Sequence, residues 1–204
     1  MRRTLRIRGM TLVEVITVIG ILIIIMVAVS AFQYNVLNYN RSAAVQLTNV
    51  QEAQALMKIM VRELRSMEPS VHGAYPITTA GTSSISFFSN IDSDPLVEQV
   101  HYYLSGSDLY KATIKPSGSP LQYIWSDEQL KIIATGLSVS STTPLFDYFT
   151  GQYDGTTASM SYPLNLTIIR LVQINLRIDT DPNKSPIVRT FSSRVSLRNL
   201  KDNL

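Results

Sequence analysis

The 204-residue sequence contains no cysteine and only one tryptophan. Without cysteine, the chain has no disulfide framework, no thiolate metal site and no cysteine nucleophile. Only two histidines are present, His72 and His101. They lie far apart and lack the spacing of metal ligands, so each is expected to be an ordinary loop or strand residue. No nucleophile, base and acid stand out as a catalytic set, so the sequence predicts a protein that is not an enzyme.

Positive charge is sparse outside the first nine residues. The chain has 18 basic and 15 acidic side chains, and four of the basic ones lie in the segment from Met1 to Gly9. Removal of those four arginines would leave 14 basic against 15 acidic side chains, a formal balance of −1. The basic balance of the whole chain therefore gives no support for nucleic-acid binding, and a nucleic acid is not an expected partner.

Residues 10–32 form one long apolar run in which Glu14 is the only charge. About 20 apolar residues in a helix are enough to cross the hydrocarbon core of a bilayer. The four arginines precede the run, whereas the first charge after it is Arg41. The positive-inside rule therefore predicts a single membrane span with its N-terminus in the cytoplasm and the rest of the chain outside.

The stretch Gly9-Met10-Thr11-Leu12-Val13-Glu14-Val15, after a basic leader, resembles the N-terminus of type IV pilins and of the pseudopilins of type II secretion and competence systems. The resemblance implies removal of leader 1–9 by a prepilin peptidase, between Gly9 and Met10, and N-methylation of Met10. It also implies that Glu14 guides assembly by facing the new amino terminus of a neighbouring subunit. The other implied partners are membrane lipid, further pilin subunits, an assembly platform protein and an assembly ATPase.

Two other interpretations of the apolar run stay open. In a secretory signal peptide, Ala28-Val29-Ser30 would direct cleavage before Ala31. A plain single-pass anchor would need no cleavage. Glu14 itself also has a simpler interpretation, because a carboxylate in the first turn of a helix favours the positive end of the helix dipole.

Three features depart from the pilin pattern. Met10 stands where many members have phenylalanine, Ala31 stands where major pilins often have proline, and the cysteine-bridged loop of many major pilins is absent. The last two departures favour a minor pilin or a pseudopilin.

Proline and glycine are both missing from residues 21–68. In the second half of this stretch, apolar side chains recur every three or four residues, which predicts that the helix continues as an amphipathic helix over residues 33–68 and stops at Pro69. The apolar face comprises Leu47, Val50, Ala53, Met57, Met60, Leu64 and Met67. Its methionines are expected to fill a core rather than bind metal. Asparagines within residues 35–40 are the expected weak point of the helix.

Residues 69–204 are expected to form a globular antiparallel β head, so the predicted fold class is α+β with the long helix packed on the sheet. Alternating apolar and polar residues predict strands near residues 85–87, 100–104, 109–114, 172–178 and 190–198. Residues 128–133 fit a short helix or a strand. Residues 76–84 are expected to be a loop, and residues 143–161 to be irregular.

The head offers weak signals for ligands. Asp92 with Asp94, and Asp179 with Asp181, could bind calcium, but the twelve-residue calcium-loop pattern is missing and a turn before proline explains both pairs. No cofactor is therefore predicted. The expected function is a pilin-like structural subunit of a pilus or pseudopilus. The alternative is a minor pilin whose head binds a surface, DNA or a secreted substrate through its many tyrosines, and an anchored enzyme is a third class.

Overall fold

The computed structural model describes residues 10–92, 94–137, 143–179 and 188–200, with backbone alone for residues 38–49 and 198. The described chain is α+β, as expected, with one long helix followed by antiparallel strands. It divides into two compact units, Met1–Val45 and Gln46–Leu204. The leader, the expected cleavage point after Gly9 and Asp181 lie outside the described residues.

Helix α1 (Leu12–Arg65) is continuous, including residues 35–40, where a weak point was expected. It begins two residues after the expected start at residue 10 and ends three residues before the expected end at residue 68, differences close to those typical of helix ends. The chain after it is joined to the second strand of the head, because the amide of Glu68 donates to the carbonyl oxygen of Phe88 at 3.1 Å. Met67 and Ser89 also form an antiparallel bridge.

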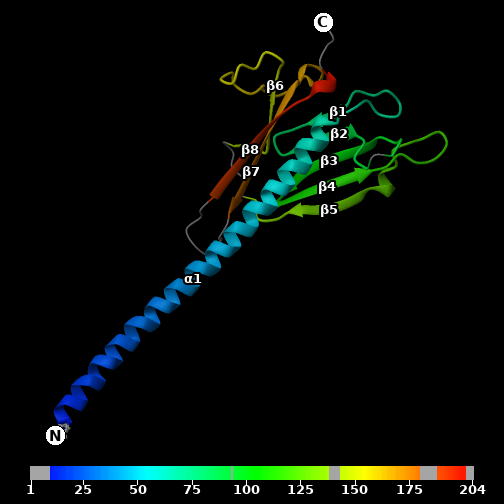
Figure 1. Cartoon of the computed structure of the whole chain (residues 1–204). Coiled ribbons are helices and arrows are strands. Elements are labelled where there is room, and N and C mark those ends of the chain that lie inside the picture. Colours follow the sequence, from blue (N-terminus) through cyan, green and yellow to red (C-terminus); the bar gives the residue numbers. More distant parts are fainter. Residues whose placement is uncertain (1–9, 93, 138–142, 180–187, 201–204) are drawn as a thin grey trace, which may run out of the picture. The chain divides into compact units, whose positions relative to one another are not determined.

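The larger sheet is an antiparallel meander in which neighbours in sequence are neighbours in space (Figure 1). Its strands are β1 (Ile77–Ala80), β2 (Ser84–Ser89), β3 (Glu98–Ser105), β4 (Asp108–Ile114) and β5 (Gln129–Ala134). The tight β3–β4 hairpin pairs Ser105 with Asp108. Gly106 adopts a φ of +62° in this turn, a conformation that glycine tolerates without strain.

A smaller antiparallel sheet has the order β6-β7-β8. Its strands are β6 (Phe146–Phe149), β7 (Leu171–Asp179) and β8 (Val188–Ser196), and short 3₁₀ turns occur at η1 (Trp125–Asp127), η2 (Leu166–Ile168) and η3 (Arg198–Leu200). The sequence predicted one sheet, whereas the described head has two. The loop expected over residues 76–84 contains β1, and the irregular stretch expected over residues 143–161 contains β6. Both strands have four residues and are fixed by pairing with longer neighbours, which a local pattern does not reveal.

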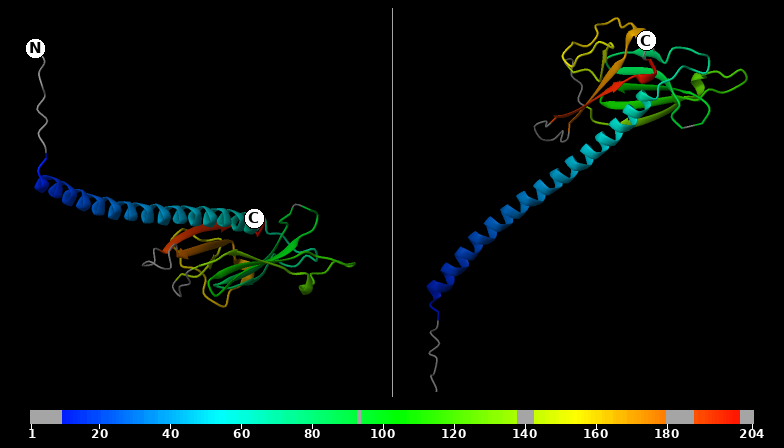
Figure 2. Two further views of the ribbon diagram at one scale, coloured as in Figure 1. Left: turned by 90° about the horizontal axis from the view of Figure 1, so that it is seen from below. Right: turned by 45° about the horizontal axis from the view of Figure 1, so that its top comes forward.

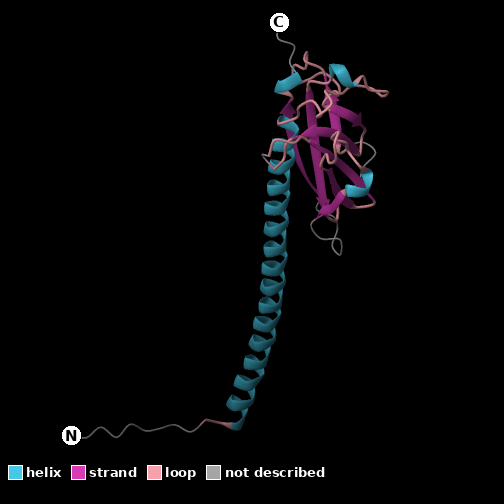
Figure 3. Ribbon diagram, turned by 90° about the vertical axis from the view of Figure 1, so that its right-hand side faces the viewer, coloured by secondary structure: helices cyan, strands magenta, loops and turns pink. Residues whose placement is uncertain are grey.

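Within the second unit, the end of α1 and both sheets share one hydrophobic core. The last turns of α1 lie along one side of the strands (Figures 2 and 3). The described part of the expected apolar stripe is confirmed as core, since Met60 and Leu64 are fully buried and Met67 is 1% exposed. The sheets contribute Ile85, Phe87, Val100, Tyr102 and Leu109 from the first and Phe146, Tyr148, Val172, Ile174 and Val195 from the second.

Tyr148 holds the two sheets together. Its ring is 1% exposed, and its hydroxyl donates to the carbonyl oxygen of Gly81, in the β1–β2 turn, at 2.9 Å. Burial raises the pKa of this phenol, so it stays protonated as a donor. The amide of Phe146 makes a second link by donating to the carbonyl oxygen of Thr82 at 3.0 Å.

Truncation of the helix stripe should loosen the whole head. Met60→Ala removes a fully buried side chain from the core that α1 shares with the sheets, and we expect it to lower the free energy of unfolding by about 2–5 kcal/mol. Near-UV circular dichroism of the full chain in detergent, followed through urea unfolding, measures the loss. The neighbouring Ile59, which is 43% exposed, provides the control, and Ile59→Ala should cost about 1 kcal/mol or less. Equal losses in the two variants would contradict this packing.

Candidate functional site at the start of the apolar helix

The start of α1 is closed by a capping box made of Thr11 and Glu14. The amide of Glu14 donates to the Thr11 hydroxyl at 3.4 Å, and the amide of Thr11 donates to the Glu14 carboxylate at 3.5 Å. Helix starts leave backbone amides without partners, and this reciprocal pair satisfies two of them. The Thr-x-x-Glu pattern of a capping box can be read from the sequence. The expectations for Glu14, a contact with another subunit or an interaction with the helix dipole, did not include this cap.

The carboxylate of Glu14 is nevertheless not neutralised within the described chain. Its side chain is exposed, and none of the ion pairs among the described residues involves it. The carboxylate accepts a hydrogen bond from the amide of Thr11, and the backbone carbonyl oxygen of Glu14 accepts one from the Thr17 hydroxyl at 2.9 Å. The structure therefore places Glu14 at a capped helix start with its charge still available to another group.

The described residues contain one helix segment, Leu12–Leu37, that is long and apolar enough to cross a membrane. None of it is buried within the described structure. Large side chains such as Leu12, Ile24 and Phe32 are 77%, 70% and 68% exposed. An apolar surface of this size on all sides of a helix requires lipid or other helices around it.

In the head, the most deeply buried charged cluster is centred on Glu63 of α1, which is 3% exposed. Lys111 of β4 donates to one carboxylate oxygen at 2.6 Å, and the Tyr102 hydroxyl of β3 donates to the other at 2.5 Å. Burial, followed by the charge of Glu63, raises the pKa of the Tyr102 phenol far above its ordinary value. These contacts position the helix on the sheet through a charge that is fully compensated.

The sequence analysis missed Glu63 as a structural residue, although the signal is present. Glu63 lies three residues after Met60 and four before Met67, inside the apolar stripe. A lone acid within a buried helix face predicts a partner on the facing element.

A second cluster of charge surrounds Lys115, which follows β4. Its ammonium group contacts Asp92 at 2.8 Å, Asp94 at a shorter distance and Glu98 at 3.9 Å. The hydrogen bond from Lys115 lowers the pKa of Asp92. Asp92 and Asp94, which the sequence suggested as turn residues or calcium ligands, are thus brought together with Glu98 and a lysine. The amide of Leu96 donates to the Asp94 carboxylate at 2.7 Å, as in a turn.

Within the Lys115 cluster, Glu98 is the buried carboxylate whose hydrogen bonding is incomplete. It is 2% exposed, and its Oε1 atom has no hydrogen-bond partner. Burial raises its pKa, the amide of Ile91 opposes that shift, and the charges of Asp92 and Asp94 add to it.

The other expected residues lie where ordinary packing would place them. His72 is in an exposed turn and meets the Tyr123 ring edge-on, whereas His101 is in β3 beside Tyr103. Burial lowers the pKa of His101.

The tyrosines divide between core and surface. Tyr102 and Tyr148 are buried, whereas Tyr103 stacks on Tyr110 at 5.1 Å between ring centres, on the face of the sheet away from Tyr102.

No model of a known protein family matches the chain, and no curated protein sequence matches it. Function is therefore inferred from the chain's own residues and their geometry.

Loss of Lys111 should leave Glu63 buried without a cationic partner. We expect Lys111→Met to lower the free energy of unfolding by about 3 kcal/mol, the lower end of the range for broken buried pairs, because Tyr102 keeps one hydrogen bond. Lys131 is the cross-strand neighbour of Lys111 and is exposed, so Lys131→Met is the matched control and should have little effect. Addition of Glu63→Gln to Lys111→Met should recover part of the loss, and urea unfolding that shows no recovery would contradict a charge-based role.

Glu98 should make stability fall as the pH rises. Its pKa is raised in the folded chain, so the folded state keeps the proton to a higher pH than the unfolded state does. The ionised group therefore costs stability above its raised pKa, and this cost disappears below the ordinary value of 4.5. We expect Glu98→Gln to raise the melting temperature at neutral pH, with a gain that shrinks as the pH falls through the raised pKa and is absent below 4.5.

The melting temperatures of the wild-type chain and of Glu98→Gln are compared at each pH. Asp92 and Asp154 have lowered pKa values, and their effect on acid stability then cancels because both proteins contain them. Glu128→Gln, at an exposed site, is the control and should not change the melting temperature. A less stable Glu98→Gln protein at neutral pH would show that the contact with Lys115 outweighs the burial of the charge.

Proposed function

We propose that the chain is a pilin-like structural subunit of a type IV pilus or a type II secretion pseudopilus. It is made as a precursor, cut between Gly9 and Met10 by a prepilin peptidase, N-methylated at Met10 and held in the cytoplasmic membrane until assembly. The observation that carries this proposal is the exposed apolar surface of Leu12–Leu37, which has the charged residue Glu14 in the capped first turn of the helix.

A membrane anchor alone requires the apolar surface but not the acid. A charge in the first turn of a span is costly unless it is paired or lies at the interface. Cleavage after Gly9 would create an amino group on Met10, with an ordinary pKa of about 7.7–8.0, and it would be mostly cationic at neutral pH. This amine on one subunit and Glu14 on the next would neutralise one another as the helices pack side by side.

Such pairing would also fix the axial offset between subunits. Apolar helices slide along one another with little change in energy, because lipid tails and leucine side chains are similar surroundings. A single charge pair has one favourable register. Gly20 lies on the exposed surface of the helix, and small residues allow neighbouring helices to approach closely.

The proposal implies membrane lipid, other pilin subunits, the assembly platform protein and the assembly ATPase as partners. It places the N-terminus in the cytoplasm and the head outside, and it requires no catalytic residue. The stacked pair Tyr103 and Tyr110 would suit the alternative, a minor pilin whose head binds a ligand, since their rings are only partly buried.

Glu14→Gln tests the pairing because it keeps the cap. Glutamine serves in a capping box as glutamate does, so the variant removes the charge and leaves the helix start intact. We expect it to be cleaved normally, to stay in the membrane and to be lost from filaments. N-terminal sequencing of the membrane and filament fractions measures cleavage, and quantitative blotting of the sheared filament fraction measures incorporation.

Thr11→Val is the matched control. It removes the capping hydroxyl, keeps the charge, and should enter filaments at close to the wild-type level because a lost cap costs only about 1 kcal/mol. Normal incorporation of Glu14→Gln would refute the pairing. A wild-type chain whose N-terminus is Ala31 would identify a secretory signal peptide instead.

A further inference from the structure

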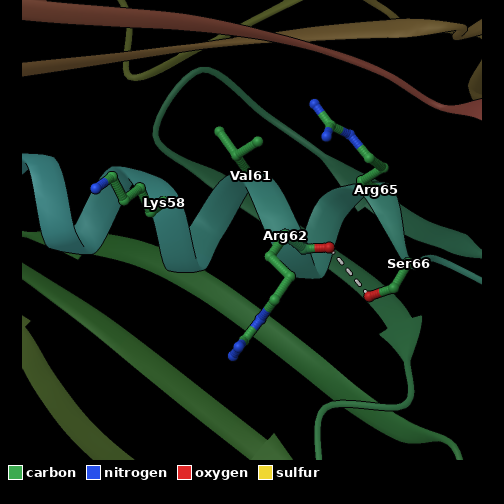
Figure 4. A pocket seen from close by; sticks show the side chains of 5 residues that line it. All are labelled: Lys58, Val61, Arg62, Arg65 and Ser66. Atoms are coloured by element: carbon green, nitrogen blue, oxygen red, sulfur yellow. Dashed lines mark hydrogen bonds between the residues drawn. The ribbon is translucent and has the colours of Figure 1, made fainter.

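The outward face of the last turns of α1 carries a cationic hollow formed by Lys58, Arg62 and Arg65 with Val61 and Ser66 (Figure 4). Its volume is about 380 Å³. The three cationic side chains are exposed and extend outward around the hollow. Among the described residues, the ion pairs involve Lys111 and Lys115 and none of these three cations.

A surface of opposite charge, the acidic turn, lies elsewhere on the same head, in the η1 turn that precedes β5. Trp125, the only tryptophan of the chain, is 68% exposed there. The adjacent carboxylates of Asp127 and Glu128 are also exposed, and no ion pair within the described residues involves either one. The hydroxyls of Ser117 and Ser126 donate to Asp127 at 3.2 Å each and hold the acidic turn in place.

The cationic hollow and the acidic turn lie on opposite sides of the larger sheet. In the left view of Figure 2, the yellow-green η1 lies beyond the strands, away from the end of α1. One head therefore cannot close this contact with itself, although two copies can. Because the two surfaces are different, each copy keeps one of them free for the next, and such a head-to-tail contact continues into an open filament.

The geometry points to a second copy of this chain as the partner of the cationic hollow, bound through its acidic turn. Lys58, Arg62 and Arg65 would neutralise Asp127 and Glu128 of the neighbour, and the Trp125 ring would lie against an arginine by a cation–π contact. Aromatic and arginine side chains are the residue types that dominate interface energies. This contact deepens the proposed function, on which it rests, by adding a head contact to the helix packing.

The absence of cysteine from the chain permits a direct test. Full-length chains that carry Arg65→Cys and Glu128→Cys are given different tags and co-expressed, and the membranes are mildly oxidised. We expect a mixed disulfide dimer at a yield several-fold above that of Arg65→Cys with Gln152→Cys, an exposed position in a different loop. Added salt should lower the yield, because exposed charges are screened. A yield no higher than that of the control pair overturns the contact.

Charge reversal supplies the second test and does not depend on cysteine chemistry. The hollow variant Arg62→Glu/Arg65→Glu and the turn variant Asp127→Lys/Glu128→Lys should each reduce incorporation into filaments by at least about tenfold. The two changes combined in one chain should restore it, which a folding defect would not allow. If the turn variant assembles normally, or if the combination stays defective, the anion that meets the hollow is another molecule, such as lipid or DNA, and the proposal is wrong.

The outcomes separate this contact from the proposed function. A wild-type chain that is cleaved after Gly9 and enters filaments, but gives no Arg65–Glu128 cross-link, overturns the head contact alone. A cross-link formed by a chain that is never cleaved overturns the proposed function alone.

Discussion

The apolar surface of residues 12–37 is the constraint on which the rest of the protein depends. None of this surface is buried within the described structure, and Glu14 is its only charged residue, so lipid or other helices are more favourable surroundings than water. The surface must be covered by lipid, by other helices or by each in succession. In the proposed function, lipid would cover this surface first and neighbouring helices afterwards, without a change of fold.

Two of the acids on α1, Glu14 and Glu63, are in opposite situations. Glu63 is buried against the larger sheet and has its partners, Lys111 and Tyr102, within the same chain. Glu14 has a cap from Thr11 but no cation among the described residues. The charge of Glu63 is therefore compensated within the described chain, whereas that of Glu14 is not. A charge left without compensation in an apolar segment is the feature that a second subunit would correct, and this contrast between the two acids is the physical basis of the proposed assembly.

Charge on the surface of the head follows a related pattern. The acidic residues near β3 gather around Lys115 and are partly neutralised there. The cations at the end of α1 and the carboxylates after Trp125 have no such partner in the described chain. Exposed charges tolerate this state because water solvates them, so they contribute to selection of a neighbour and to its register rather than to the stability of the head.

The sequence by itself determined the long helix, its apolar and amphipathic halves, the buried methionine stripe and the principal strands, because each is a repeat of local chemistry at a period of 3.6 or 2 residues. The sequence also contains the capping pattern of Thr11 and Glu14, and an acid, Glu63, within the apolar face of the helix. Only the tertiary structure decided that the strands form two sheets, that β1 and β6 are strands, and that Lys111 and Tyr102 meet Glu63 or Lys115 meets Glu98. The contacts of Glu63 and Lys115 join residues that are 17 to 48 positions apart, and a local pattern carries no information about contacts between distant segments, which depend on how the whole chain packs.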